Sequence, residues 1–201
     1  PDGILTGVIY TDGSGVHTQR AATARAGWGL CSVGSGTARV TGAAHGPLPL
    51  FTQSVGNADI YAAAVALRVA ATPIEIVSDY QRFLDGWKLG YGACTSDGSK
   101  CGEAWALFWA VAEDFGLASI AVRKVAAHLP SPAAADGLIT LQDWMGNRRA
   151  DREAKKGVAL HPCNASTVRS ADQLKGRRAM LCLYLARLNL QGMAKGWNAW
   201  H

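Results

Sequence analysis

The chain has 201 residues, a formal net charge of +5 and a sequence pI of about 9.1. Because 49% of the residues are hydrophobic and only 17% are charged, the composition excludes a disordered chain and allows a sizeable core. No apolar run is long enough to cross a bilayer, so we expect no membrane partner. The basic excess is typical of proteins that meet polyanions, of which nucleic acid is the commonest.

The five cysteines, at positions 31, 94, 101, 163 and 182, show neither a CxxC pair nor the Cys/His spacing of a zinc site. This pattern favours free thiols in a reducing compartment, and therefore an intracellular location, nuclear or cytoplasmic. Cys94 and Cys101 flank a turn-rich stretch and are an alternative pair in an oxidising setting. Because the chain begins with Pro1 rather than Met, we expect it to be a piece of a larger polypeptide that has other domains. We also expect a monomer.

The first part of the chain predicts three antiparallel strands. Leu5–Tyr10 is apolar and β-prone, and it runs into Thr11–Gly15, which we interpret as a turn that ends the strand. Two further short strands, Ala26–Val33 and Thr37–Ala44, are joined by the hairpin turn Gly34–Gly36.

The rest of the chain alternates between helical and strand patterns. A helical period over Ala58–Ala71 stops at Pro73, and the short apolar run Ile74–Asp79 then predicts a buried strand. Farther on we expect a helix over Tyr80–Trp87, a loop over Gly90–Gly102 and a helix over Glu103–Phe115, with Trp105 and Trp109 in the core. A strand over Ser119–Ala126, a loop over Pro130–Ala135 and a helix over Trp144–Lys156 follow, and we expect this last helix to stop at Gly157.

This order of elements predicts an α/β fold. We expect a mixed five-stranded sheet, with three antiparallel strands followed by two parallel ones, flanked by helices over residues 1–160. Residues 161–201 are interpreted as a linker and a C-terminal amphipathic helix from about Ser170 to Lys195. That helix either packs on the domain, connects to a neighbouring one, or contacts nucleic acid through its basic side.

Two predicted strands lead into a carboxylate. Asp12 follows the first strand and Asp79 ends the fourth, so adjacent strands would bring both together, with Asp59 on the helix between them and Asp151 on the last helix. Clustered carboxylates repel one another unless cations lie between them, and hard oxygen ligands suit Mg²⁺ or Mn²⁺. Two such ions are the usual device for cleaving a phosphodiester bond. Each carboxylate also has a structural interpretation, as a turn former, a helix cap, a first-turn acid or a solvated charge.

Four blocks, taken in order, resemble the motifs of the type 1 ribonuclease H family. They are Ile9–Ser14, Asp59–Leu67, Ile76–Tyr80, and Val122–His128 together with Gly146–Asp151. The resemblance covers residues 4–158 and implies a ribonuclease H-like fold, in a copy of retroelement origin. It also implies an endonuclease that cuts the RNA strand of an RNA–DNA hybrid with two Mg²⁺ ions, or with Mn²⁺ in their place.

The resemblance assigns roles residue by residue. Asp12, Asp79 and Asp151 match the metal ligands, Asp59 stands where the family has a glutamate, and His128 matches the family's loop histidine, which is catalytic. The implied contacts to the nucleic acid are Gly13, Ser14, Gly15, Gln53, Ser54 and Asn147.

Two departures from the family leave the activity open. Asp59 is one methylene shorter than glutamate, so its carboxylate would fall roughly 1.5 Å short of the metal unless the helix shifts. The segment Trp87–Trp105 has only Lys88 and Lys100 as cations, so the basic protrusion that some members use to grip the hybrid is missing. A binding or scaffold module without efficient catalysis and another nuclease of the same fold are therefore alternatives.

Eight other acidic residues are interpreted as solvated charges or caps, and His45 as a surface residue. The acids in this group are Glu75, Asp85, Glu103, Glu113, Asp114, Asp143, Glu153 and Asp172.

Overall fold

The structure is a computed structural model that describes residues 5–19, 23–34, 39–127, 129–130, 132–161 and most of 169–183. The chain divides into two units, residues 1–161 and 162–201. The elements of the first unit are β1 (Leu5–Val16), β2 (Arg25–Val33), β3 (Val40–Pro47), α1 (Val55–Val69), β4 (Ala70–Ser78), α2 (Gln81–Leu89), α3 (Tyr91–Thr95), α4 (Gly102–Phe115), a 3-10 turn (Leu117–Ser119), β5 (Ile120–Lys124), α5 (Pro132–Ala135) and α6 (Leu141–Ala159).

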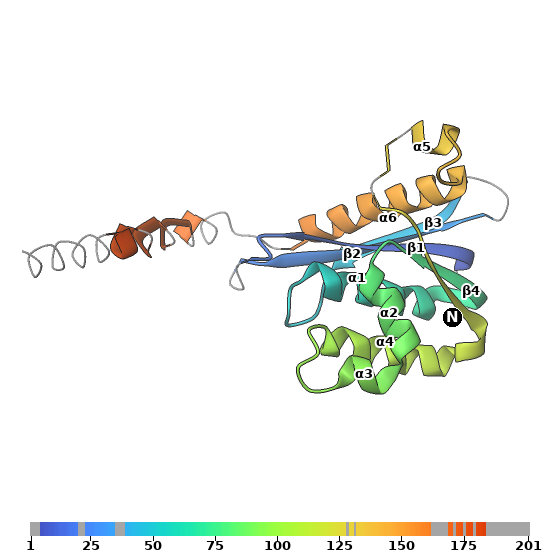
Figure 1. The fold of residues 1–201 in the computed structure, drawn as a ribbon, viewed down its shortest axis with the longest axis horizontal. Coiled ribbons are helices and arrows are strands. Elements are labelled where there is room, and N and C mark those ends of the chain that lie inside the picture. Colours follow the sequence, from blue (N-terminus) through green and yellow to red (C-terminus); the bar gives the residue numbers. More distant parts are fainter. Residues whose placement is uncertain are drawn as a thin grey trace, which may run out of the picture. The chain divides into compact units, whose positions relative to one another are not determined.

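The five strands form one sheet in the order β3-β2-β1-β4-β5. The first three strands pair antiparallel, whereas β4 pairs parallel to both β1 and β5, which confirms the predicted mixed sheet. Helix α6 packs against β1, β2 and β3 on one face, and α1 covers the other face with α4 packed against it (Figure 1). The central strand β1 therefore lies between the two layers of helices, and its neighbouring residues Ile9 and Tyr10 are both buried.

The core on the α1 side is rich in aromatic rings. Phe83, Trp105 and Phe108 are buried, Trp87 stacks on Trp109 with ring centroids 5.3 Å apart, and Trp105 and Trp109 are each only 5% exposed. The prediction that these two tryptophans belong to the core is confirmed.

The core on the α6 side depends on a backbone contact at Gly29 in β2. A Cβ atom at this position would lie 2.6 Å from the main-chain oxygen of Ala150 and would also overlap the main-chain nitrogen of Ala154. The helix therefore rests directly on the strand, at a distance that no other residue type permits.

We expect Gly29→Ala to lower the free energy of unfolding by about 2–3 kcal/mol, because the added methyl group forces α6 away from the sheet. Gly92→Ala in α3 is the matched control, since no atom lies within 4 Å of a Cβ built there. Urea unfolding of the two variants measures the difference, and equal midpoints would contradict the close contact at Gly29.

The strand β1 is longer than the sequence predicts. The stretch Gly13–Gly15, interpreted as a turn, continues the strand to Val16, because β2 offers an unbroken antiparallel partner as far as Arg25. Helix α1 ends at Val69 rather than at the predicted Ala71, and Pro73 lies in β4 where the register with β1 shifts. A proline is tolerated there because a shifted register requires no N–H at that position.

Other boundaries also differ from the prediction. The expected loops at 90–102 and 130–135 contain the short helices α3 and α5. Gly157 does not stop α6; it lies inside the helix and lets the helix backbone approach the main chain of Gly46. Cys94 and Cys101 are free, as are the other cysteines in the described part of the chain, so the alternative pair does not form.

In the second unit, the described residues between 169 and 183 are helical, which confirms an extra helix near the C-terminus. Leu174, Met180, Leu181 and Leu183 are exposed. The remainder of the predicted helix, to Lys195, lies outside the described residues. Among the helices that the structure describes, none is long and apolar enough to span a bilayer.

Candidate metal centre

Asp12 and Asp79 lie side by side just beyond the C-terminal end of the pairing between the inner strands β1 and β4. The parallel pairing of β1 with β4 stops at Thr11 and Ser78, and each aspartate is the next residue along its chain. Asp12 itself pairs with Gly29 of β2, so it lies within a strand and is not a turn former. Asp79 provides no side-chain cap for α2, whose N-cap residue is Tyr80. The structural interpretations of these two aspartates are therefore wrong.

Asp59 of α1 completes a cluster of three carboxylates. One carboxylate oxygen from each of Asp12, Asp59 and Asp79 lies within 4.8 Å of the other two. Asp12 and Asp59 are 7% and 3% exposed. The main-chain N–H of Gly13 donates to the Oδ1 atoms of both, at 2.9 Å from Asp12 and 2.8 Å from Asp59, and so fixes the two side chains relative to each other.

The close approach of α1 to β1 compensates for the short side chain of Asp59. A Cβ atom at Gly13 would lie 2.6 Å from the main-chain nitrogen of Asp59 and 2.7 Å from the main-chain oxygen of Val55. The helix therefore rests on the strand at this glycine. The carboxylate of Asp59 reaches the cluster without the extra methylene of a glutamate.

The cluster carries an electrostatic cost that a cation would relieve. Burial, followed by the charges of Asp79 and Asp151, raises the pKa of Asp12 to about 8, although the Gly13 N–H and Lys155 oppose this shift. Burial raises the pKa of Asp59 well above its usual range, and the charges of Asp12 and Asp79 raise it further. Buried carboxylates with raised pKa values are a donor set that suits a hard divalent ion.

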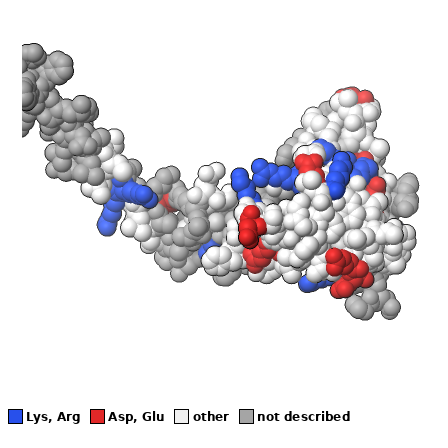
Figure 2. All heavy atoms as spheres, turned by 60° about the horizontal axis from the view of Figure 1, so that its bottom comes forward, with Lys and Arg blue, Asp and Glu red and all other residues white. Residues whose placement is uncertain are grey.

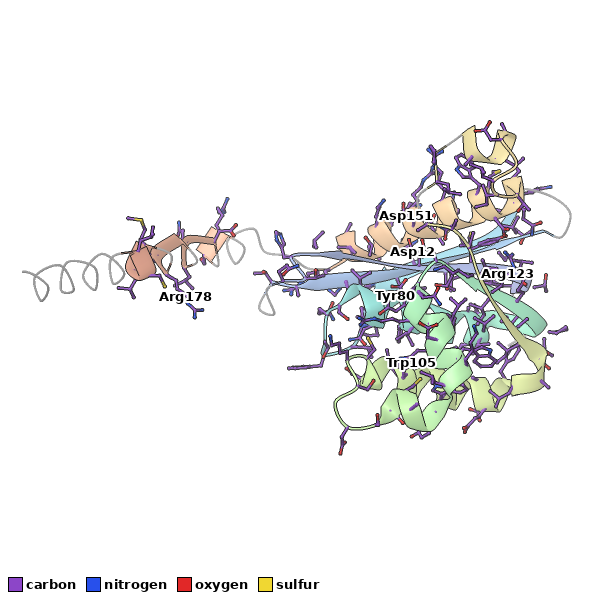
Figure 3. The ribbon with its side chains drawn as sticks, viewed as in Figure 1. Asp12, Tyr80, Trp105, Arg123, Asp151 and Arg178 are labelled. Atoms are coloured by element: carbon purple, nitrogen blue, oxygen red, sulfur yellow. The ribbon has the colours of Figure 1, made fainter. Side chains whose placement is uncertain are left out.

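Asp151 faces the cluster from α6. It lines the same hollow of about 330 Å³ as the three carboxylates, which we call the carboxylate hollow, but it does not belong to the tight group of three. Figure 3 shows Asp151 on α6 above Asp12 on β1. Lys155, one turn later, places its Nζ 2.7 Å from Asp151 Oδ2 and lines the same hollow. The sequence prediction missed Lys155, although its spacing of four residues from Asp151 was a usable signal.

Asn147 joins the site through Asp79. Its Nδ2 donates to Asp79 Oδ2 at 3.2 Å, and its Oδ1 has no hydrogen-bond partner within the described residues. Lys124 donates to the main-chain oxygen of Asp79 at 3.3 Å. These two residues hold Asp79 in place from α6 and β5.

The structure does not gather all the predicted substrate contacts in one place. Gly13, Ser14 and Gly15 line the carboxylate hollow. The side chain of Gln53 is instead bonded to the main chain, accepting from Ala26 N–H and donating to the oxygens of Leu48 and Leu50. Ser54 is the N-cap of α1, where its Oγ accepts from Asn57 N–H at 3.1 Å. His128 lies outside the described residues.

Glu153 is not the solvated charge that the sequence predicts. It is 1% exposed and lies 2.7 Å from Nδ1 of His45, 2.7 Å from Nε of Arg149 and 2.9 Å from Nζ of Lys156. Burial raises the pKa of Glu153, but Lys156, Arg149 and His45 outweigh that effect and bring it below its usual value. This cluster ties α6 to β3, and it makes His45 a partner of a buried acid rather than a free surface residue.

A second network corrects the same interpretation of Glu75 and Asp143. The hydroxyl of the buried Tyr10 donates to Asp143 at 2.7 Å. Arg123 of β5 bridges Asp143, at 2.9 Å, and Glu75, at 3.1 Å (Figure 3). The network therefore joins β1, β4 and β5 to the first turn of α6 and helps to hold that helix on the sheet.

Comparison with known proteins identifies the fold as ribonuclease H-like. The sequence matches no protein-family model and no curated protein. The structure is similar to the RNase H domain of PFV, with a TM-score of 0.57 and 18% identity over 77% of this chain and 94% of that domain. The N-terminal RNase H domain of rv2228c from Mycobacterium tuberculosis has a TM-score of 0.50 and 14% identity, over 82% of this chain and 99% of that one.

A further similarity is to a longer polypeptide. The foamy viral protease-reverse transcriptase in complex with RNA/DNA hybrid has a TM-score of 0.55 and 15% identity over 79% of this chain. The similarity spans only 20% of the length of that protein.

Proposed function

We propose that the chain is a metal-dependent nuclease that hydrolyses the RNA strand of RNA–DNA hybrids. The observation that carries this proposal is the cluster of Asp12, Asp59 and Asp79, with oxygens within 4.8 Å of one another at the edge of a ribonuclease H-like sheet. The similar foamy viral protein was determined in complex with an RNA/DNA hybrid, which supports this class of substrate. In that protein the similar region is one part of a longer polypeptide, and we infer that this chain also works beside other domains.

The four aspartates would hold the metal. Asp12, Asp59, Asp79 and Asp151 all line the carboxylate hollow and would bind two Mg²⁺ ions, or Mn²⁺ in their place. Bound there, the ions would supply the positive charge that activates a water molecule and stabilises the leaving oxygen. The raised pKa values of Asp12 and Asp59 are consistent with a site whose carboxylates are fully ionised only beside a cation.

The other residues of the site orient these ligands and leave room for the substrate. The Gly13 N–H holds Asp12 and Asp59, while Asn147 holds Asp79. Gly13 and Gly15 present no side chains to the hollow, so a sugar-phosphate backbone can approach β1 closely. In this proposal Ser14 and the free acceptor of Asn147 contact that backbone, and His128 carries protons during the reaction or helps to release the product.

A cleavage assay with four labelled substrates tests the proposal. The purified chain is incubated in Mg²⁺ or Mn²⁺ with an RNA–DNA hybrid, duplex RNA, duplex DNA or single-stranded RNA. We expect cleavage only of the RNA strand in the hybrid. Equal cleavage of another duplex would indicate a different nuclease, and hybrid binding without cleavage in either metal would indicate a binding module.

A further inference from the structure

The exposed side of α6 carries cations that the proposed reaction does not use. Arg148, Arg152 and Lys155 are exposed, and their spacing of four and three residues places them on one side of the helix. Arg148 and Arg152 form no ion pair with any acid in the part of the chain that the structure describes. Their charges are therefore available to a partner.

These cations adjoin the carboxylate hollow. Arg148 lines a hollow of about 410 Å³ together with Trp144, Asn147 and Asp151. Arg148 and Trp144 also line a neighbouring hollow of about 310 Å³ with Arg152. Since Asp151 borders both the first of these hollows and the carboxylate hollow, the surface is continuous from the carboxylates across α6.

The first of the arginines is held in place by an aromatic ring. The guanidinium carbon of Arg148 lies 4.9 Å from the centre of the Trp144 ring, and Trp144 is itself fixed by a 3.1 Å hydrogen bond from its Nε1 to the oxygen of Leu129. An arginine held over an aromatic ring loses less side-chain freedom when it binds. Its planar set of donors matches the oxygens of a phosphate better than a lysine does.

The distribution of charge along the chain points the same way. The segment Trp87–Trp105 has two cations, Lys88 and Lys100, whereas α6 has five, at positions 148, 149, 152, 155 and 156, against three acids, at 143, 151 and 153. Figure 2 shows basic side chains in a row across this face of the folded domain, with acidic side chains among them. The positive charge of the described domain is therefore concentrated on the helix that also carries Asp151.

We propose that the α6 basic face, formed by Trp144, Arg148, Arg152 and Lys155, binds the phosphate backbone of the RNA strand beside the cleavage site. The inference rests on the proposed function, which supplies the hybrid. We assign the RNA strand because the face adjoins Asp151, one of the four aspartates at which that strand would be cut. It takes the place of a basic protrusion in holding the substrate.

Hybrid binding in the presence of a chelator, where nothing is cut, tests the α6 basic face. Fluorescence anisotropy of a labelled hybrid is measured over a range of salt concentrations for the wild type and for the Arg148→Ala, Arg152→Ala double variant. We expect the double variant to bind about 10-fold more weakly and to lose close to two units from the slope of log K against log salt, about 0.9 for each phosphate contact. Thermal unfolding checks that the variant is folded.

The control removes the same charge elsewhere. Arg68 and Lys88 are exposed on α1 and α2 and line none of the three hollows, so the Arg68→Ala, Lys88→Ala double variant should bind within twofold of the wild type. The inference is overturned if the two double variants weaken binding equally, if only the control does, or if neither does.

A second hybrid tests the assignment of the strand. Uncharged methylphosphonate linkages are introduced into its DNA strand only, and the effect of the α6 double variant should persist. If the effect disappears, the face binds the DNA strand and the inference is wrong. Because neither measurement depends on cleavage, loss of the proposed reaction and loss of this binding face give different results. Cleavage and binding that are both insensitive to the α6 variant would overturn the inference and leave the nuclease intact.

Discussion

Replacing Asp12 with Asn is expected to lower the rate of hybrid cleavage by at least about 100-fold. A group that merely supports a metal ligand costs about 10–100-fold when it is removed, so a ligand at the centre of the cluster should cost more. Asp12 is that central group, because it shares the Gly13 N–H with Asp59 and lies beside Asp79. Cleavage of a labelled hybrid measures the loss. Asp85→Asn, an exposed acid on α2, should retain wild-type activity.

The same substitution is expected to stabilise the protein in the absence of metal. The pKa of Asp12 is raised to about 8 in the folded chain, whereas it lies near 4 in an unfolded chain. Between these values the folded state binds more protons than the unfolded state. The free energy of unfolding of the wild type therefore falls as the pH rises from about 4 to about 8, and it levels off above that range. Asp12→Asn removes this contribution, so its stability in chelator should vary less with pH.

Thermal unfolding with and without Mg²⁺ connects the two effects. A cation that binds only the folded wild type adds about 2.7 kcal/mol at 100 times its Kd, and this gain should be missing in Asp12→Asn. A variant that still cuts the hybrid, or that gains as much from Mg²⁺ as the wild type, would remove Asp12 from the metal centre.

The sequence was sufficient to predict the fold and to predict that two carboxylates lie close together, because both follow from patterns within short stretches of the chain. The apolar runs and their turns define the order of the strands, and a parallel pair of central strands brings residues that follow each strand to the same edge. The proximity of Asp12 and Asp79 could be predicted from the order and direction of the strands alone. The structure places them at the end of the ladder between β1 and β4, even though β1 itself continues to Val16.

Features set by contacts between distant segments could not be predicted. Glu153 has the sequence surroundings of a solvated helix acid, and it is buried because His45, more than 100 residues earlier, lies beside it on β3. The position of α1 over β1 depends on Gly13, whose sequence surroundings indicated a turn. The free charges of Arg148 and Arg152 depend on which acids lie near them, and helical spacing alone does not show this.

The second prediction with a large effect is that lengthening the side chain of Asp59 lowers the activity. From the sequence, the carboxylate of Asp59 was expected to fall short of the metal, and on that basis a glutamate would reach it better. In the structure the carboxylate of Asp59 already accepts the Gly13 N–H at 2.8 Å and lies within 4.8 Å of the other ligands. Since α1 rests on Gly13 and Asp59 is only 3% exposed, an extra methylene must displace either the carboxylate or the helix.

We therefore expect Asp59→Glu to lower the cleavage rate by about 10–100-fold, because a misplacement of about 1 Å at a reacting centre costs up to 100-fold. Rates in Mg²⁺ and in Mn²⁺ measure the loss, and thermal unfolding separates it from a loss of folded protein. Asp59→Asn keeps the length and removes the charge, so it should lose activity as fully as Asp12→Asn. A rate in Asp59→Glu equal to or above that of the wild type would show instead that the aspartate is too short and that α1 yields to the longer side chain.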